Sequence, residues 1–148
     1  MSDNPIFSYV QPEEKAGYLL WQVSMGWHLQ MNQQLRPLDL TLTQFSLLAG
    51  LYWLHRQGEA VTQQRLADYA NTDRMMTSKV LQTLERKGLL ERHSHQQDGR
   101  AKQLRLTVAG DTLLRQANAV VEQVDAQFFG PLQAEAGLFS QLLSRLMG

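Results

Sequence analysis

TQQRLADYANTDRMMTSKVLQTLERKGLLERHSHQQDGRAKQLRLTVAG, residues 62–110, is the stretch of this sequence that decides the fold. In its first half, apolar residues recur at helical spacing over 63–70 and again over about 73–87. In its second half the spacing changes to the alternation of a β-strand, on both sides of the hairpin-forming pair Asp98-Gly99. Two short helices joined by a tight turn and followed by a hairpin are the elements of a winged helix-turn-helix.

The second short helix is predicted to have one inward and one outward face. Asn71 or Thr72 is expected to cap it, and Met76, Val80 and Leu84 recur every four residues as its inward side. The outward face and its N-terminal end carry residue types that can address base edges or phosphates in a major groove, namely Thr72, Arg74, Met75, Ser78 and Lys79. Taken alone, the same residues also suit an ordinary solvated helix surface.

The segments on either side predict longer and more apolar helices, at 13–35, at 44–57 with Thr43 as the cap, at 108–129 with Thr107 as the cap, and from Pro131 onward. The first and last of these segments are too apolar for the surface of a small monomer, which indicates a core shared between two copies. We therefore expect one mainly α-helical domain, with dimerisation helices at 1–40 and 107–148 and the winged helix-turn-helix at 41–106.

The charge of the chain is zero overall but unevenly placed. Lys plus Arg and Asp plus Glu each number 14. Residues 62–106 hold nine of the basic and five of the acidic residues, so this window carries +4 and the remainder −4. Binding to DNA phosphates needs a local positive surface rather than a positive protein. The basic window coincides with the predicted helix-turn-helix and hairpin.

Three motifs give the sequence a family resemblance. LTQFSLL (42–48), LERKGLLER (84–92) and DGRAKQLRLTVAG (98–110) are similar to the corresponding motifs of the MarR family of transcriptional regulators. The wing of that family reads D-x-R, a small residue, a basic residue and alternating apolar positions into L-T-x-x-G, and every one of these positions is matched. The resemblance covers about 35–110 by motif and the rest of the chain by element order.

The resemblance implies a homodimer whose terminal helices interlock and whose two winged helix-turn-helices bind a pseudo-palindromic operator in double-stranded DNA. Asp98, Arg100 and Lys102 fall on its wing motif. Arg100 follows a tight turn, where a guanidinium suits a narrow minor groove, and Asp98 can bond the turn backbone or hold the arginine. An exposed turn with a local ion pair is the alternative interpretation.

Trp21, Tyr52 and Trp53 are candidate ligand-binding residues. The resemblance implies that small aromatic acids or phenols bind between the dimerisation and DNA-binding lobes, although core packing would use the same rings. The sequence has no cysteine, no glycine-rich phosphate loop and no nucleophile motif, and His93 and His95 lack a third metal ligand nearby. We therefore expect no enzymatic activity, no metal and no cofactor.

The longest apolar run, at 47–54, is far shorter than the roughly 20 residues that cross a bilayer, and no signal peptide is visible, so we expect a cytoplasmic protein. The leading hypothesis is a dimeric, sequence-specific DNA-binding transcriptional regulator, a repressor that a small ligand relieves. The alternative is a winged-helix protein–protein interaction module that does not bind DNA.

Overall fold

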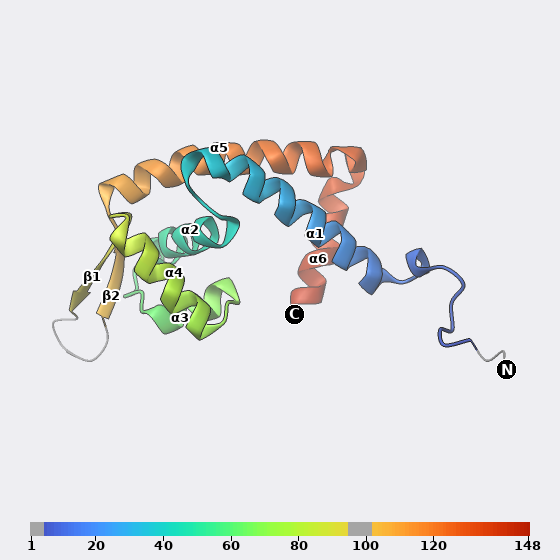
Figure 1. Ribbon diagram of the computed structural model, residues 1–148, viewed down its shortest axis with the longest axis horizontal. Helices are drawn as coiled ribbons and strands as arrows, with labels where there is room; N and C mark the ends of the chain where they lie inside the picture. The colour runs from blue at the N-terminus through green and yellow to red at the C-terminus, as the bar shows by residue number, and fades with distance from the viewer. Residues whose placement is uncertain (1–4, 95–101) are drawn as a thin grey trace.

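Helices and one two-stranded hairpin follow one another in a computed structural model, which describes residues 5–94 and 102–148 (Figure 1). In chain order the elements are α1 (Ala16–Leu35), α2 (Leu42–Arg56), α3 (Gln63–Ala70), α4 (Arg74–Arg86), β1 (Leu90–Ser94), β2 (Lys102–Leu106), α5 (Val108–Phe129) and α6 (Ala136–Met147). Short 3-10 helices stand before α1, after α1 and between α5 and α6, at Pro12–Glu14, Arg36–Leu38 and Gly130–Glu135. This order confirms the mainly α-helical winged helix-turn-helix that the sequence predicts.

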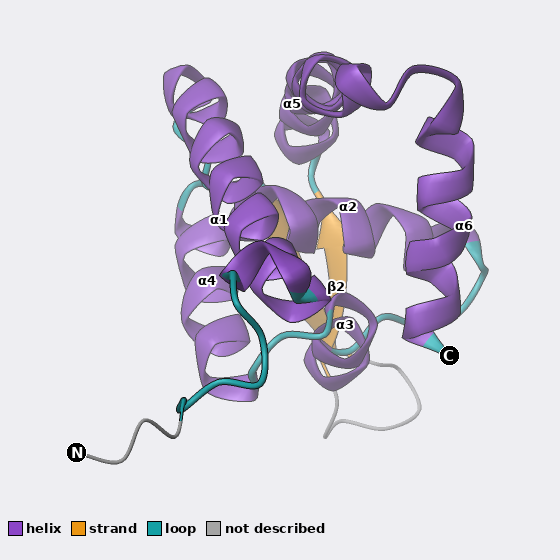
Figure 2. Cartoon of the chain, turned by 90° about the vertical axis from the view of Figure 1, so that its right-hand side faces the viewer, coloured by secondary structure: helices purple, strands orange, loops and turns teal. Residues whose placement is uncertain are grey.

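The elements form two lobes that share the long helix α5. In Figure 1, α1 lies along α5 and α6 turns back from its far end, while α2, α3, α4 and the hairpin gather at the other end. Figure 2 shows α1 and α6 on opposite sides of α5. The indole nitrogen Nε1 of Trp27 donates to Oδ1 of Asp125 at 2.8 Å, which ties α1 to α5.

The core lies around α2, which packs against α1, α3, α4, α5 and β2. Its inward side chains meet those of the surrounding elements in one cluster of fully buried residues, including Met31, Leu35, Leu48, Leu51, Leu66, Leu81, Leu84 and Leu104. Burying one such side chain is worth about 1.5–3 kcal/mol. The recognition elements are therefore mounted on the same core as the long helices.

Threonine side chains cap three of the helices, and one of them differs from the prediction. Thr62 accepts from the backbone N–H of Arg65, and Thr107 from that of Gly110, as the sequence predicts. The prediction of Thr43 as the cap of α2 was wrong. Thr41 accepts from the Gln44 amide at 3.1 Å while the Gln44 side chain accepts from the Thr41 amide, which makes a reciprocal capping box.

The terminal helices begin later than the sequence predicts. The segment 13–35 was expected to form one helix, but Pro12–Glu14 is a separate 3-10 turn and α1 starts at Ala16. Pro131 does not open the last α-helix, because Gln133 adopts a left-handed φ of 49° that interrupts the helical path. The helix α6 begins only at Ala136.

The hairpin is antiparallel, with Leu90 opposite Leu106 at its root and Ser94 opposite Lys102 at the other described end. The backbone N–H of Leu104 donates to the carbonyl of Val61 at 2.7 Å, so the outer edge of β2 is bonded to the segment before α3. These contacts fix the root of the wing to the core. Within the described ranges, no helix is both long and apolar enough to span a membrane.

Candidate nucleic-acid interface and ligand cleft

The turn between α3 and α4 sets the start of the predicted recognition helix. Asn71 takes a left-handed φ of 52° and ends α3. Asp73, rather than Asn71 or Thr72, caps α4, since its carboxylate accepts from the Met76 amide at 3.0 Å. The prediction of Asn71 or Thr72 as the cap was wrong.

Thr72 is used inside this turn. Its hydroxyl lies 2.7 Å from that of the fully buried Thr77, and Thr77 donates to the Asp73 carbonyl at 2.7 Å. Because Thr77 has only one hydroxyl proton, Thr72 must donate to Thr77. Thr72 thus has no proton left for a phosphate oxygen in this arrangement, and its contact with DNA stays a prediction that requires a rotated side chain or its methyl group.

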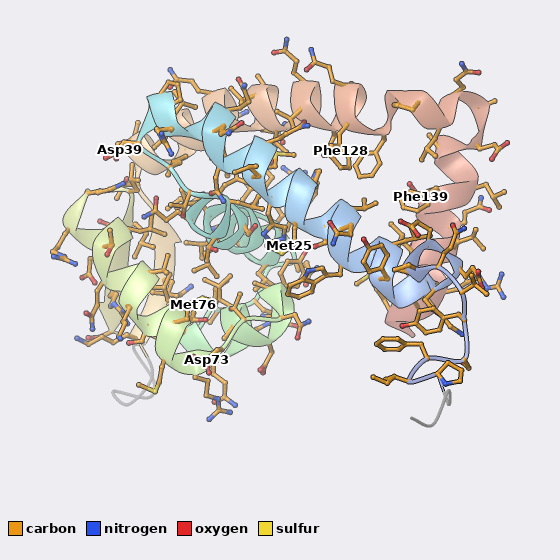
Figure 3. All side chains as sticks on the ribbon, turned by 45° about the vertical axis from the view of Figure 1, so that its right-hand side comes forward. Met25, Asp39, Asp73, Met76, Phe128 and Phe139 are labelled. Atoms are coloured by element: carbon orange, nitrogen blue, oxygen red, sulfur yellow. The ribbon has the colours of Figure 1, made fainter. Side chains whose placement is uncertain are left out.

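The inward face of α4 differs from the predicted one. Thr77, Leu81 and Leu84 are fully buried. Met76 is 40% exposed, so the predicted face was wrong at this position, whereas Val80 is half-buried and packs against the core cluster. Figure 3 shows Met76 one turn from Asp73 at the N-terminal end of α4.

The outward residues of α4 gather on its N-terminal half. Arg74, Met75 and Lys79 are exposed, and Met75 reaches 71%. Ser78 is half-buried beside them. Two cations, a flexible thioether and a hydroxyl on one helical surface can contact phosphates and the edges of bases, including thymine methyl groups.

The wing adds a further exposed cation. Lys102 is exposed at the start of β2, opposite Ser94. Asp98 and Arg100 lie outside the described residues, so their predicted roles rest on the sequence.

Tyr52 and Trp53 line a cleft between α2 and α5. Their ring centroids lie 5.4 Å apart at 79°, an edge-to-face pair. The cleft has a volume of about 220 Å³, and its other walls are Phe45, Ala49, Asp111, Leu114, Arg115 and Asn118. Trp21 does not line this cleft in the same chain; it is 65% exposed on α1. The structure therefore brings together two of the three predicted ligand residues.

A charged pair borders the same cleft and was missed from the sequence. Arg115 Nε lies 2.8 Å from Asp111 Oδ2, and its Nη2 lies 3.4 Å from Oδ1. The hydrogen bond and the charge of Asp111 raise the pKa of Arg115 above its usual value. The signal available in the sequence was the acidic–basic spacing of four residues on one helix.

A second cleft of about 390 Å³ shares Tyr52 and Asp111 with the first and lies against β2. Arg56 lies 5.6 Å from the centre of the Tyr52 ring and donates to its hydroxyl at 3.3 Å. Arg105 from β2 also lines this space. An apolar, aromatic cleft thus adjoins a cationic one, a combination suited to an aromatic acid.

A third cleft of about 570 Å³ lies where the end of α1, the start of α2 and α4 meet, and Met76 and Val80 line it. At its edge Lys87 Nζ lies 3.1 Å from Asp39 Oδ2. Among the residues described, no group of three or more His, Asp or Glu side chains is placed to hold a metal ion.

Comparisons with known proteins match most of the chain. The model of the MarR family matches residues 40–102. An uncharacterised HTH-type transcriptional regulator of Bacillus subtilis, YdcH, is 37% identical over 131 residues, which are 88% of this chain and 89% of that protein. A mutant MarR from E. coli complexed with operator DNA is 25% identical with a TM-score of 0.78, over 89% of this chain and 93% of that chain. The Mycobacterium tuberculosis MarR family protein Rv2887 in complex with salicylic acid is 30% identical with a TM-score of 0.70, over 89% of this chain and 96% of that chain.

Proposed function

The chain belongs to the MarR family of transcriptional regulators, and from this premise we propose that it is a homodimeric, sequence-specific DNA-binding repressor that a small ligand releases from its operator. The observation that carries the proposal is the outward surface of α4, where Arg74, Met75 and Lys79 are exposed, together with the exposed cation Lys102 on the wing. The similar E. coli protein was crystallised with operator DNA. Promoter DNA is the partner, so a cytoplasmic location is part of the same proposal.

The proposed contacts divide the work between two grooves. Arg74, Met75, Ser78 and Lys79 address the major groove from α4, where bidentate and apolar contacts distinguish the base pairs. The wing, with Asp98, Arg100 and Lys102, tracks the flanking minor groove and backbone, where groove width rather than base identity is read. Thr72 contributes by holding the turn that places Arg74.

The proposed dimer uses the terminal helices. Apolar side chains remain exposed on the single chain along α1 and α6, namely Leu19, Leu20, Trp21, Val23, Met25, Leu29, Leu138, Leu142, Leu146 and Met147. Such a surface is larger than a small monomer normally leaves in water. A two-fold dimer covers it and offers two copies of α4 to successive major grooves.

The ligand is proposed to enter the cleft beside Tyr52 and Trp53. Its aromatic ring packs on theirs, and its carboxylate meets Arg115 or the cations of the adjoining cleft. The cleft lies between α2 of the DNA-binding lobe and α5, which runs into the dimerisation lobe. A ligand there changes the separation of the two recognition helices, so that they no longer match successive grooves.

The test is a fluorescence anisotropy titration on duplexes selected from a random library. Arg74→Ala and Lys79→Ala should each cost about 1–3 kcal/mol on the selected site if the contact is to a base edge. If the contact is to phosphate, the loss is equal on all duplexes and the salt dependence becomes shallower. Lys15→Ala removes the same charge far from α4 and is the matched control.

The same titration separates the two function hypotheses. Salt-dependent binding that α4 variants weaken supports the DNA-binding regulator. Absence of binding to any duplex contradicts it and favours the protein–protein interaction module. Salicylic acid is the first ligand probe, with quenching of tryptophan fluorescence expected in the wild type and reduced in Trp53→Phe.

A further inference from the structure

The side chain of Arg92 joins the wing to both helices of the helix-turn-helix. Arg92 lies on β1, and its Nε is 2.9 Å from Oε2 of Glu85 in the last turn of α4. Its Nη1 donates to Oε1 of Gln63, the first residue of α3, at 3.1 Å. The Arg92 side chain is only 20% exposed. This fork is therefore less screened by solvent than an ion pair between fully exposed side chains.

The Arg92 fork holds β1, while a backbone hydrogen bond holds β2. The Leu104 amide bonds to Val61, which holds the hairpin along β2. Arg92 stands opposite Leu104 in the strand register and holds the other strand. Both strands of the hairpin are thus tied to the rest of the DNA-binding lobe, β2 by a backbone bond to the segment before α3 and β1 by the Arg92 guanidinium to α3 and α4.

We propose that Arg92, held by Glu85 and Gln63, is a positioning residue that fixes the angle between the wing and the recognition helix α4. The inference rests on the proposed DNA binding. Arg92 lies two residues before Ser94, where the described part of β1 ends, so a small rotation at this tie is magnified further along the hairpin. Loss of the tie leaves α4 able to enter its groove but lets the wing leave the groove beside it.

Substitution of Glu85 can distinguish a positioning role of Arg92 from a simple effect of surface charge on DNA binding. Glu85→Gln removes a negative charge near DNA, which by itself strengthens binding to phosphates. If Glu85 holds the wing through Arg92, the same substitution weakens the contribution of the wing. The two explanations therefore predict opposite changes in DNA affinity.

Asp39→Asn is the matched control. Asp39 pairs with Lys87 at the C-terminal end of the same helix α4, at 3.1 Å, and no hydrogen bond or ion pair joins its side chain to the described residues of the wing. The substitution makes the same change of charge, and asparagine tolerates the left-handed φ of 55° at this position. A difference in DNA affinity between the two variants therefore measures the contribution of the wing.

The experiment measures affinity on duplexes that share the selected half-sites and differ in A·T-rich or G·C-rich flanks. Relative to D39N, E85Q should lose about two- to fivefold in affinity on the A·T-flanked duplex, the range that corresponds to one partly exposed ion pair. R92M should lose more affinity than E85Q because it also removes a positive charge, and R92K should recover part of the loss because lysine keeps the charge but not the fork.

A second measurement does not depend on DNA. The chain has no cysteine, so a nitroxide attached at Ser94→Cys labels one position per protomer. Its mobility should rise in the E85Q background and stay unchanged in the D39N background, while thermal melting shows that both variants are folded.

Equal gains in affinity for E85Q and D39N, with equal nitroxide mobility, would overturn the inference, because the pair would then act only as surface charge. If the wild type binds no duplex, the proposed function fails instead. The nitroxide comparison still decides in that case whether the Arg92 fork holds the wing.

Discussion

Trp27 on α1 donates its indole N–H to the carboxylate of Asp125 on α5, with Nε1 2.8 Å from Oδ1. The bond crosses between the two longest helices and is partly buried. If the donor is removed, the partly buried carboxylate has lost water without gaining a hydrogen bond in return. Removing the donor therefore costs more free energy than the intact bond contributes to stability. The stability that is lost when this bond is broken therefore measures how strongly it holds α1 to α5.

Trp27→Phe should lower the free energy of unfolding by about 1.5–3 kcal/mol, the range for a hydrogen bond to a charged group. Asp125→Asn should cost less, because its amide oxygen still accepts from the indole. Urea unfolding followed by circular dichroism measures both. Wild-type stability in Trp27→Phe would show that the bond contributes nothing.

Gly110 is expected to tolerate no side chain. A Cβ at this position would lie 1.9 Å from the carbonyl oxygen of Leu89, where backbone rather than a movable side chain blocks it. Gly110→Ala should therefore destabilise the protein by at least about 3 kcal/mol, the upper range for overpacking. Gly137→Ala, in open space on α6, is the control and should be neutral or stabilising. Equal melting temperatures for the two variants would contradict the close approach.

Leu142→Asp on α6 should convert the proposed dimer to a monomer. Leu142 is 43% exposed in the single chain and lies outside the buried core, so the variant should keep its helical circular dichroism. Sedimentation velocity measures the mass, with Gln141→Asp on the same helix as the control. Deletion of 131–148 should also give monomer or aggregate. A stable dimer after that deletion would place the interface elsewhere.

Arg100→Ala should weaken DNA binding by about 1–3 kcal/mol without lowering the melting temperature. Arg100→Lys should recover part of the loss, since lysine keeps the charge but is more strongly hydrated. The preference for A·T-rich flanks should shrink in both variants, because the guanidinium is expected to read minor-groove width. Wild-type affinity on both kinds of flank in Arg100→Ala would exclude the wing as a minor-groove reader.

Thiol oxidation should not regulate this protein. The chain has no cysteine, and its six methionines oxidise by a different and slower route. Treatment with diamide should leave the affinity for the selected duplex unchanged in an anisotropy titration. Rapid release from DNA that dithiothreitol reverses would contradict this expectation.

Local signals in the sequence were sufficient where the chemistry is local. Thr62 and Thr107 were identified as caps because each stands directly before an amphipathic run. The cap of α2 was misassigned although its signal is present, since Thr41 and Gln44 have the Ser/Thr-x-x-Glu/Gln spacing of a capping box. The capping residue of α4 was predicted wrongly because three residues that can cap a helix, Asn71, Thr72 and Asp73, follow one another in the sequence.

Tertiary contacts decided what the sequence could not. The inward face of α4 was read from apolar residues alone, but the fully buried Thr77 is a polar residue whose hydroxyl is satisfied within the turn. For the candidate ligand site, Tyr52 and Trp53 are neighbours on one helix, so their proximity was predictable. Whether Trp21 joins them depends on how helices pack, and spacing along the chain carries no information on that.

The bond from the Leu104 amide to Val61 also bears on how the protein avoids self-association. This bond occupies part of the outer edge of β2, whereas the described residues of β1 make no such backbone bond on their outer side. An unpaired edge invites another chain to add a strand and so to aggregate. Glu91 and Arg92 occupy β1, and charged side chains on an edge oppose such pairing. The described part of β1 is therefore expected to resist the addition of a further strand.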